Sequence, residues 1–330
     1  MSFAAILGQE PAVKTLERAL QSGKVHHAYR FEGPPGVGKN LAALALARAL
    51  LCEQPTPFAC ESCGACKRAA TFAGEDTQLP AHADLLIVER GLYRNVIPAS
   101  EATGISIEQI RRIVLSRVGF APHEGRAVVC IVRGADELTV SAANALLKTL
   151  EEPPDRTFFV LLTSKPSRLL DTIRSRTLPV RFGPLSEAIV GKLLEERGLD
   201  PKLALLAQGS MEQAMALSDA DALALREGFA RHIIAGLDAP DLAAALAFAE
   251  KAKLERQELT ELLSHLAQVL ALKARELVGG GHQPGLALGP DEARRTSRQY
   301  EVVRGALADL ERNVGPQLAL EAMMAKLRRA

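Results

Sequence analysis

A glycine-rich segment near the N-terminus has the residue types of a phosphate-binding loop. Residues 33–40 read GPPGVGKN, which fits the pattern G-x-x-x-x-G-K up to its last position. Gly33, Gly36 and Gly38 allow backbone N–H groups to wrap around a phosphate, and the helix that follows adds a favourable dipole. Lys39 adds a positive charge. The segment lies between a short apolar run and an Ala/Leu-rich stretch, the strand-to-helix context of this motif. We therefore predict a nucleotide phosphate site rather than an ordinary Gly/Pro turn.

The positions that should hold magnesium have different chemistry. The last residue of the loop is Asn40, where a Ser or Thr hydroxyl would bind the ion. The apolar run 128–132, the best candidate for the second strand of such a site, is followed by Arg133 instead of an acid. Asp136 and Glu137 come slightly later, and a register slip would bring one of them closer. We expect ATP or ADP to bind weakly or not at all, with little or no hydrolysis by this chain.

Four of the five cysteines lie close together, and their spacing is that of a metal site: Cys52, Cys60, Cys63 and Cys66. Four soft sulfur ligands suit tetrahedral zinc. An iron–sulfur cluster and free thiols are the alternatives. We predict a structural zinc site in a module over residues 52–66. Cys130 lies inside an apolar run and reads as a small buried hydrophobe.

The composition is that of an ordinary soluble protein. The chain has 330 residues, 40 Lys and Arg against 39 Asp and Glu, and 48% hydrophobic residues. These values exclude a disordered tail, a collagen-like fibre and a highly basic nucleic-acid coat. Aromatic residues make up only 4% with no Trp, which argues against a base-stacking platform. The start lacks a signal-peptide pattern, and apolar stretches are interrupted before the ~20 residues that a bilayer requires. We expect a cytoplasmic protein without membrane contact.

Apolar runs alternate with helical patterns over the first 180 residues, which favours a parallel α/β sheet covered on both faces. The expected strands are 27–32, 84–88, 127–132, 157–162 and 178–182, and the main helices are 10–20, 39–51, 107–118 and 140–150. After Gly183 the pattern is helical. We predict an α/β P-loop domain over 1–183, a small helical lid domain over 184–216 and an all-α domain over 217–330, interrupted by the glycine-rich stretch 279–285.

Two further segments resemble known motifs. Residues 142–154 read AANALLKTLEEPP and residues 173–176 read IRSR, and both are similar to motifs of bacterial clamp-loader subunits of the AAA+ class. Specific motifs extend over residues 1 to about 215, and the helical remainder fits the collar domain of that family by character only. Within the family, the non-hydrolysing delta-prime branch is most similar. The resemblance implies gamma/tau and delta subunits, primer–template DNA and, indirectly, a sliding clamp as partners, and a role in DNA replication.

The resemblance also implies roles for single residues. Arg176 corresponds to the arginine that reaches the ATP site of a neighbouring subunit, although Thr177 stands where the family has Cys. Thr163 corresponds to a first sensor residue. Glu212 stands where ATP-hydrolysing members have a sensor arginine. The family carries a similar zinc module. A solvated or intradomain salt-bridge arginine is the alternative for Arg176.

Two other functions are the alternatives: an active gamma/tau-like loader ATPase, and another AAA+ DNA-remodelling subunit such as a Holliday-junction helicase. The basic residues Arg111, Arg112, Arg117 and Lys148 would suit duplex phosphates, but solvated helix faces explain them equally well.

Overall fold

A computed structural model describes residues 3–54, 57–72, 79–93, 97, 104–237, 254–279 and 290–329. The chain divides into two compact units, Met1–Ile189 and Val190–Ala330. The predicted division at 216/217 falls inside the second unit, and the separate lid domain stays a prediction. Most of the glycine-rich stretch 279–285 lies outside the described residues.

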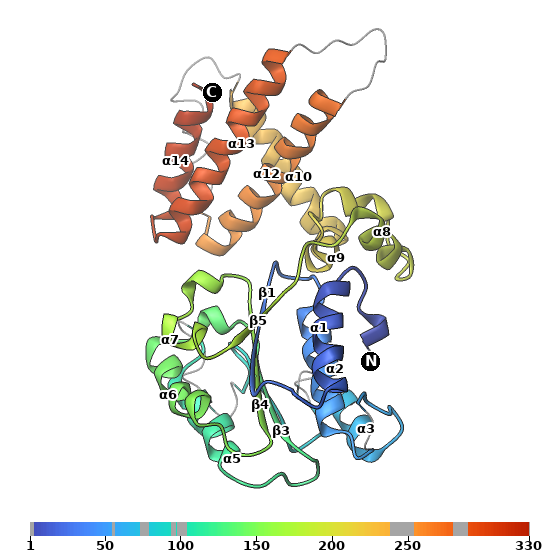
Figure 1. Ribbon diagram of the computed structural model, residues 1–330. Helices are drawn as coiled ribbons and strands as arrows, with labels where there is room; N and C mark the ends of the chain where they lie inside the picture. The colour runs from blue at the N-terminus through green and yellow to red at the C-terminus, as the bar shows by residue number, and fades with distance from the viewer. Residues whose placement is uncertain are drawn as a thin grey trace. The chain divides into compact units, whose positions relative to one another are not determined.

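The first unit is built on a five-stranded sheet of strand order β2-β3-β4-β1-β5, and every neighbouring pair is parallel (Figure 1). The strands are β1 Ala28–Glu32, β2 Leu85–Val88, β3 Val128–Val132, β4 Thr157–Thr163 and β5 Leu178–Arg181. All five predicted strands are confirmed. Every residue of β3 is buried, as a central parallel strand covered on both faces requires.

Helices cover both faces of the sheet. Figure 1 shows α1 (Glu10–Gln21) and α2 (Lys39–Leu51) on one face, and α5 (Ser116–Val118), α6 (Val140–Glu151) and α7 (Asp171–Arg174) on the other. Helix α6 begins where the side chain of Thr139 accepts a hydrogen bond from the backbone of Ala142, as predicted. Leu146 of α6 and Phe159 of β4 are fully buried in the core between them. The predicted helix 107–118 consists of α4 (Ile107–Gln109), a π-helical turn over Ile110–Leu115, and α5.

The carboxyl ends of the parallel strands bring the predicted phosphate-site residues to one edge of the sheet, together with Glu89, which was not predicted. The glycine-rich loop follows β1, Glu89 follows β2, Arg133 follows β3, and Thr163 ends β4. Only glycine fits at position 33, because its φ is +152° and an added Cβ would lie 2.2 Å from the carbonyl oxygen of Phe182. The fold thus places the loop against the end of β5.

The second unit contains helices and, among its described residues, no strand. Its main helices are α9 (Met211–Leu217), α10 (Ala220–Leu237), α12 (Arg256–Gly279), α13 (Pro290–Glu311) and α14 (Pro316–Leu327). Helix α8 (Glu187–Glu195) spans the boundary with the first unit, and a 3-10 turn, Pro201–Leu205, follows it. Leu263, Val303 and Met324 from three of these helices share one apolar core. No helix in the described part of the chain is long and apolar enough to cross a bilayer.

Candidate functional site

The phosphate loop connects β1 to α2 and has the backbone of an anion cradle. Gly36 and Gly38 adopt positive φ angles of 68° and 101°. Helix α2 begins at the next residue, Lys39. Positive-φ residues ahead of a helix N-terminus direct successive N–H groups toward one point, which is the arrangement that receives a phosphate.

A buried glutamine holds this loop in place. Gln9 is only 2% exposed, and its Nε2 donates to the backbone oxygens of Val37 (3.2 Å) and Gly183 (2.7 Å). Its Oε1 accepts from the backbone N–H of Gly183 at 3.1 Å. Gln9 was not identified from the sequence, because a polar residue directly before a helix reads as a cap, whereas its side chain makes no cap hydrogen bond.

Lys39 is 9% exposed, and its ammonium group lies within the loop. Its Nζ donates to the backbone oxygens of Gly33 (2.6 Å) and Pro34 (2.5 Å). The predicted residues Gly33, Gly36, Gly38 and Lys39 therefore form one cradle that carries a mostly buried positive charge.

Arg133 lies against the residue at the magnesium-ligand position. Its Nε donates to Oδ1 of Asn40 at 2.9 Å, and its Nη1 pairs with Oε2 of Glu89 at 3.1 Å. The side chain of Arg133 is 14% exposed and that of Glu89 is 38% exposed. Magnesium requires oxygen ligands in a near-octahedral arrangement, and the side-chain oxygen of Asn40 already accepts from a cation. The residues present do not fit the magnesium ion that this fold class implies.

Asp136, the first of the two acids that follow β3, has its partners at the end of β4. Asp136 lies in a 3-10 turn, Ala135–Glu137, and its Oδ1 accepts hydrogen bonds from Oγ1 of Thr163 (2.5 Å) and from the backbone of Ser164 (3.1 Å). This carboxylate therefore connects the turn after β3 to the end of β4. Thr163 lies at the predicted tip of β4 and is 1% exposed. The register slip considered from the sequence is not observed, because β3 ends at Val132.

Arg176 follows α7 and is partly exposed. Its Nη2 lies 2.6 Å from Oε1 of Glu151, and its Nη1 donates to the backbone oxygen of Thr172 at 2.9 Å. The two motifs that carry the family resemblance thus meet in space, since Glu151 is the last residue of α6. Arg174 points to a different partner, Asp171, at 2.9 Å. Within the single chain, Arg176 makes the intradomain salt bridge that was the alternative to a finger role.

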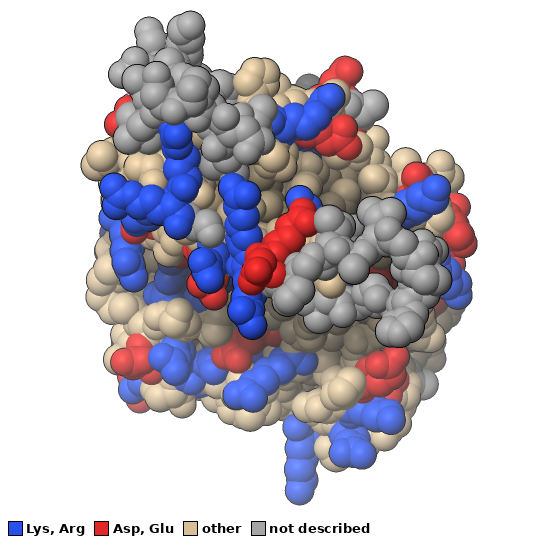
Figure 2. All heavy atoms as spheres, turned by 90° about the horizontal axis from the view of Figure 1, so that it is seen from above, with Lys and Arg blue, Asp and Glu red and all other residues tan. Residues whose placement is uncertain are grey.

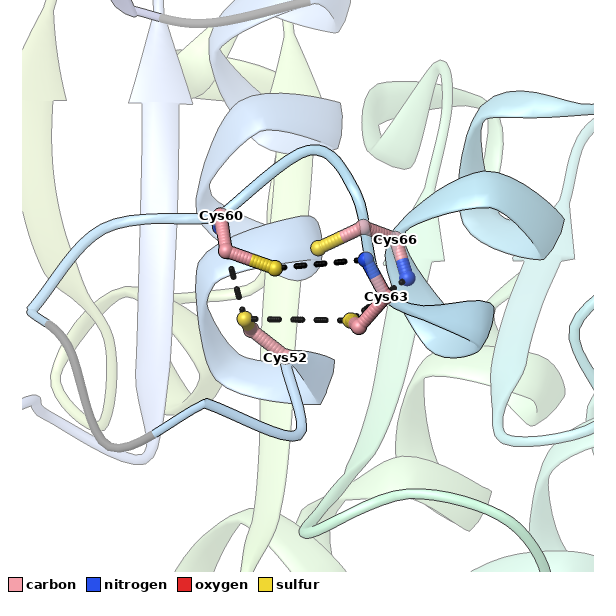
Figure 3. A group of neighbouring side chains, drawn as sticks. All are labelled: Cys52, Cys60, Cys63 and Cys66. Atoms are coloured by element: carbon pink, nitrogen blue, oxygen red, sulfur yellow. Dashed lines mark hydrogen bonds between the residues drawn. The ribbon is translucent and has the colours of Figure 1, made fainter.

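The four clustered cysteines converge on one point (Figure 3). The Sγ atoms of Cys52, Cys60, Cys63 and Cys66 all lie within 4.8 Å of one another. Cys52 directly follows α2, and Cys63 caps α3 (Gly64–Ala70). Backbone N–H groups point at the sulfurs, with Cys60 donating to Cys52 (3.4 Å), Cys63 to Cys60 (3.3 Å) and Cys66 to Cys63 (3.4 Å). This donor set fits a structural zinc ion with four protein ligands.

The thiols of this cluster differ in their acidity. Burial raises the pKa of Cys66 to about 12 and also raises that of Cys52. A hydrogen bond from the Ser62 hydroxyl and backbone donors lower the pKa of Cys60 to about 6. Since zinc binds thiolates, we expect its binding to release protons, mainly from the two buried residues.

Two of the candidate DNA-contacting arginines, Arg117 and Arg112, have partners within the chain. Arg117 pairs with Asp84, a fully buried carboxylate that also accepts from the backbone of Glu124 (2.7 Å) and Gly125 (2.9 Å). Burial by itself raises the pKa of Asp84, but these donors together lower it below its usual value. Arg112 pairs with Glu108 at 2.5 Å. Figure 2 shows basic side chains interspersed with acidic ones on the face it presents.

Known proteins share this sequence pattern. The sequence profile described as "DNA polymerase III, delta subunit" matches residues 8–186, more than half of the chain. The chain is 35% identical over 229 residues to the tau subunit of DNA polymerase III from Bacillus subtilis, covering 66% of this chain and 37% of that protein. It is also 35% identical over 202 residues to the delta' subunit of the same bacterium, covering 60% of this chain and 54% of that protein.

A solved structure of a DNA polymerase III gamma subunit-related protein from Thermotoga maritima aligns with 96% of this chain and 98% of its own, at 17% identity and a TM-score of 0.42. The matched residues correspond to less than two thirds of the length of either Bacillus relative. The profile match covers the sheet, the phosphate loop, the cysteine cluster and the turn that carries Arg176. This chain belongs to the family of AAA+ clamp-loader subunits of DNA polymerase III.

Proposed function

We propose that this chain is a non-hydrolysing, delta-prime-like subunit of the clamp loader. In this role it assembles with gamma/tau and delta subunits and helps to place the sliding clamp on primed DNA. It supplies Arg176 to the ATP site of a neighbouring subunit. Its own phosphate loop takes no part in hydrolysis.

One observation carries the first half of the proposal. Arg133 donates to Oδ1 of Asn40 at 2.9 Å, so a guanidinium lies against the position that a magnesium ligand would occupy. Hydrolysis at a P-loop depends on magnesium to neutralise the charge that develops on the phosphates. A fixed cation bonded to the ligand position opposes metal binding by charge and by occupancy. Turnover at this loop is therefore disfavoured.

Sequence identity does not distinguish the two branches of the family, because the chain is 35% identical to both the tau and the delta' subunit of Bacillus subtilis. The distinction rests on the chemistry at Asn40, at Arg133 and at Glu212, where a sensor arginine is expected in an active subunit. All three residues oppose the gamma/tau alternative.

The second half of the proposal depends on how readily Arg176 can leave Glu151. The side chains of this pair are 34% and 46% exposed. Ion pairs at such exposure contribute only ~0–1 kcal/mol, because water solvates both partners well. A γ-phosphate offers a planar guanidinium a stronger, bidentate partner. The contact with Glu151 therefore orients Arg176 in the free chain without preventing its use by a neighbour.

The test is DNA-stimulated ATP turnover in a loader reconstituted from this chain and its partner subunits. Arg176→Ala is expected to lower turnover at least ~10-fold, because a trans arginine stabilises charge on the transferring phosphoryl group. Arg176→Lys keeps the positive charge but loses the planar guanidinium, which can bind two phosphate oxygens at once. Its turnover should therefore stay close to that of Arg176→Ala. Arg174→Ala is the matched control, since this arginine lies two residues away and pairs with Asp171.

Size-exclusion chromatography must first show that each variant assembles as wild type does. Turnover at the wild-type level in both the Arg176→Ala and the Arg174→Ala assemblies would rule out the finger role. ATP hydrolysis by this chain alone, lost on Lys39→Ala, would instead favour the active gamma/tau-like alternative.

A further inference from the structure

We propose that Arg133 takes the place of the divalent cation, so that the phosphate loop binds a diphosphate group, as in ADP or inorganic pyrophosphate, without metal. This inference rests on the proposed non-hydrolysing role, because an active ATPase would need magnesium here. It adds a ligand class and a metal-free binding mode to that role.

The charges around the loop are suited to this task. A metal-dependent site combines the loop lysine with a divalent cation that bridges phosphate oxygens. Here Lys39 is 9% exposed and the side chain of Arg133 is 14% exposed. Charges with so little exposure are weakly screened by solvent and salt. The loop therefore keeps two strong cations without any metal ion.

Asn40 positions the guanidinium of Arg133 beside the phosphate loop. It is the second residue of α2 and directly follows Lys39, so the group bonded to its Oδ1 lies beside the N-terminus of the helix. The helix dipole favours an anion at that end. A carboxamide oxygen is a poor ligand for magnesium in this position, but it is a good acceptor for an arginine N–H. The unexpected asparagine and the unexpected arginine thus form one functional pair.

Glu89 is the internal competitor for the anion. Its carboxylate pairs with Nη1 of Arg133 at 3.1 Å, which neutralises the guanidinium in the free chain. Because the Glu89 side chain is 38% exposed, it can return to solvent when a phosphate replaces it. We therefore expect the affinity for diphosphate to depend on both residues, with opposite signs.

The test is titration calorimetry of the full chain with ADP and with inorganic pyrophosphate, in EDTA and in magnesium. The proposal predicts binding in EDTA and no gain with magnesium, since the metal is repelled by Arg133 and competes for the phosphate oxygens. Arg133→Met should weaken binding ~10–100-fold, as expected for loss of a charge-assisted hydrogen bond. Glu89→Gln should tighten binding several-fold.

Glu108→Gln is the matched control for the second variant. Glu108 is 40% exposed and pairs with Arg112 at 2.5 Å, in a segment that the loop does not include. This change should leave the affinity as it is. Circular dichroism melting identifies any variant that fails to fold, and the Glu89→Gln and magnesium measurements test the proposal without Arg133→Met.

The outcomes separate the two proposals. Absence of ADP and pyrophosphate binding in both buffers would overturn the metal-free site and leave the non-hydrolysing role intact. Metal-free binding that is unchanged by Arg133→Met would overturn the role of this arginine. Binding that requires magnesium and leads to ATP turnover would overturn both proposals.

Discussion

Helix α2 runs between two candidate cation sites, the phosphate loop before its first turn and the cysteine cluster after its last residue. The two sites differ in the ligands that they offer a metal ion. At the first turn of α2, the position for magnesium is occupied by the Arg133–Asn40 pair. Directly after its last residue, Cys52 joins three other cysteines whose sulfurs lie within 4.8 Å. At the phosphate loop, a guanidinium lies where magnesium would need hard oxygen ligands, whereas the cysteine cluster offers four soft sulfur ligands. A site motif is therefore informative only when each ligand position is examined for its own chemistry.

The largest effect is expected at the cysteine end. Cys66→Ser should remove bound zinc and destabilise the first unit by several kcal/mol, because zinc binding contributes folding free energy directly. Zinc content by atomic emission and thermal unfolding with and without EDTA check this expectation. Cys130→Ala is the control, since Cys130 is buried in β3 away from the cluster and its loss should leave zinc content unchanged. Wild-type protein that is purified without zinc, and whose melting neither EDTA nor added zinc changes, would contradict the assignment.

Zinc binding by the cysteine cluster should depend on pH. The raised pKa values of Cys52 and Cys66 mean that protons compete with zinc for these sulfurs. The affinity for zinc is therefore expected to fall as the pH is lowered from about 8 to about 6, by on the order of 10–100-fold per pH unit when one or two protons are displaced. Chelator competition at several pH values measures this slope. A flat profile would mean that the buried thiols are already ionised without the metal.

A smaller effect is expected when oxygen ligands for magnesium are introduced at the phosphate loop. The double change Asn40→Thr with Arg133→Asp supplies a hydroxyl and a carboxylate, the hard ligands that magnesium prefers. ADP binding should then become magnesium-dependent, with a gain of ~10-fold on adding the metal. Asn40→Thr alone is the control and should show no such gain, because Arg133 remains. If the double variant is equally indifferent to magnesium, the present residues are not what excludes the metal.

Much of the fold and part of these sites could be predicted from the sequence. Apolar runs such as 128–132 identify buried parallel strands, because burial on both faces removes polar residues from them. The cysteine cluster was visible because all four ligands are close in sequence. By contrast, Arg133 contacts Glu89, which follows a different strand, and Asn40, which lies in helix α2. These contacts depend on how the side chains are oriented in the folded chain.

Two other anchors were missed for the same reason. Asp84 reads as the first residue of an apolar run, although its buried carboxylate accepts from Arg117 and from a distant loop. Gln9 reads as a helix-flanking polar residue, although its side chain donates hydrogen bonds to both Val37 of the phosphate loop and Gly183. Neither role has a local sequence pattern, since each depends on contacts that exist only once the sheet has formed.

In the proposed role, this chain acts on a neighbour's nucleotide and not on its own. The most direct measurement compares Lys39→Ala with Arg176→Ala in the same reconstituted loader, under DNA-stimulated ATP turnover. We expect unchanged turnover for Lys39→Ala and a loss of at least ~10-fold for Arg176→Ala. The reverse result, with turnover lost on Lys39→Ala and retained on Arg176→Ala, would contradict it.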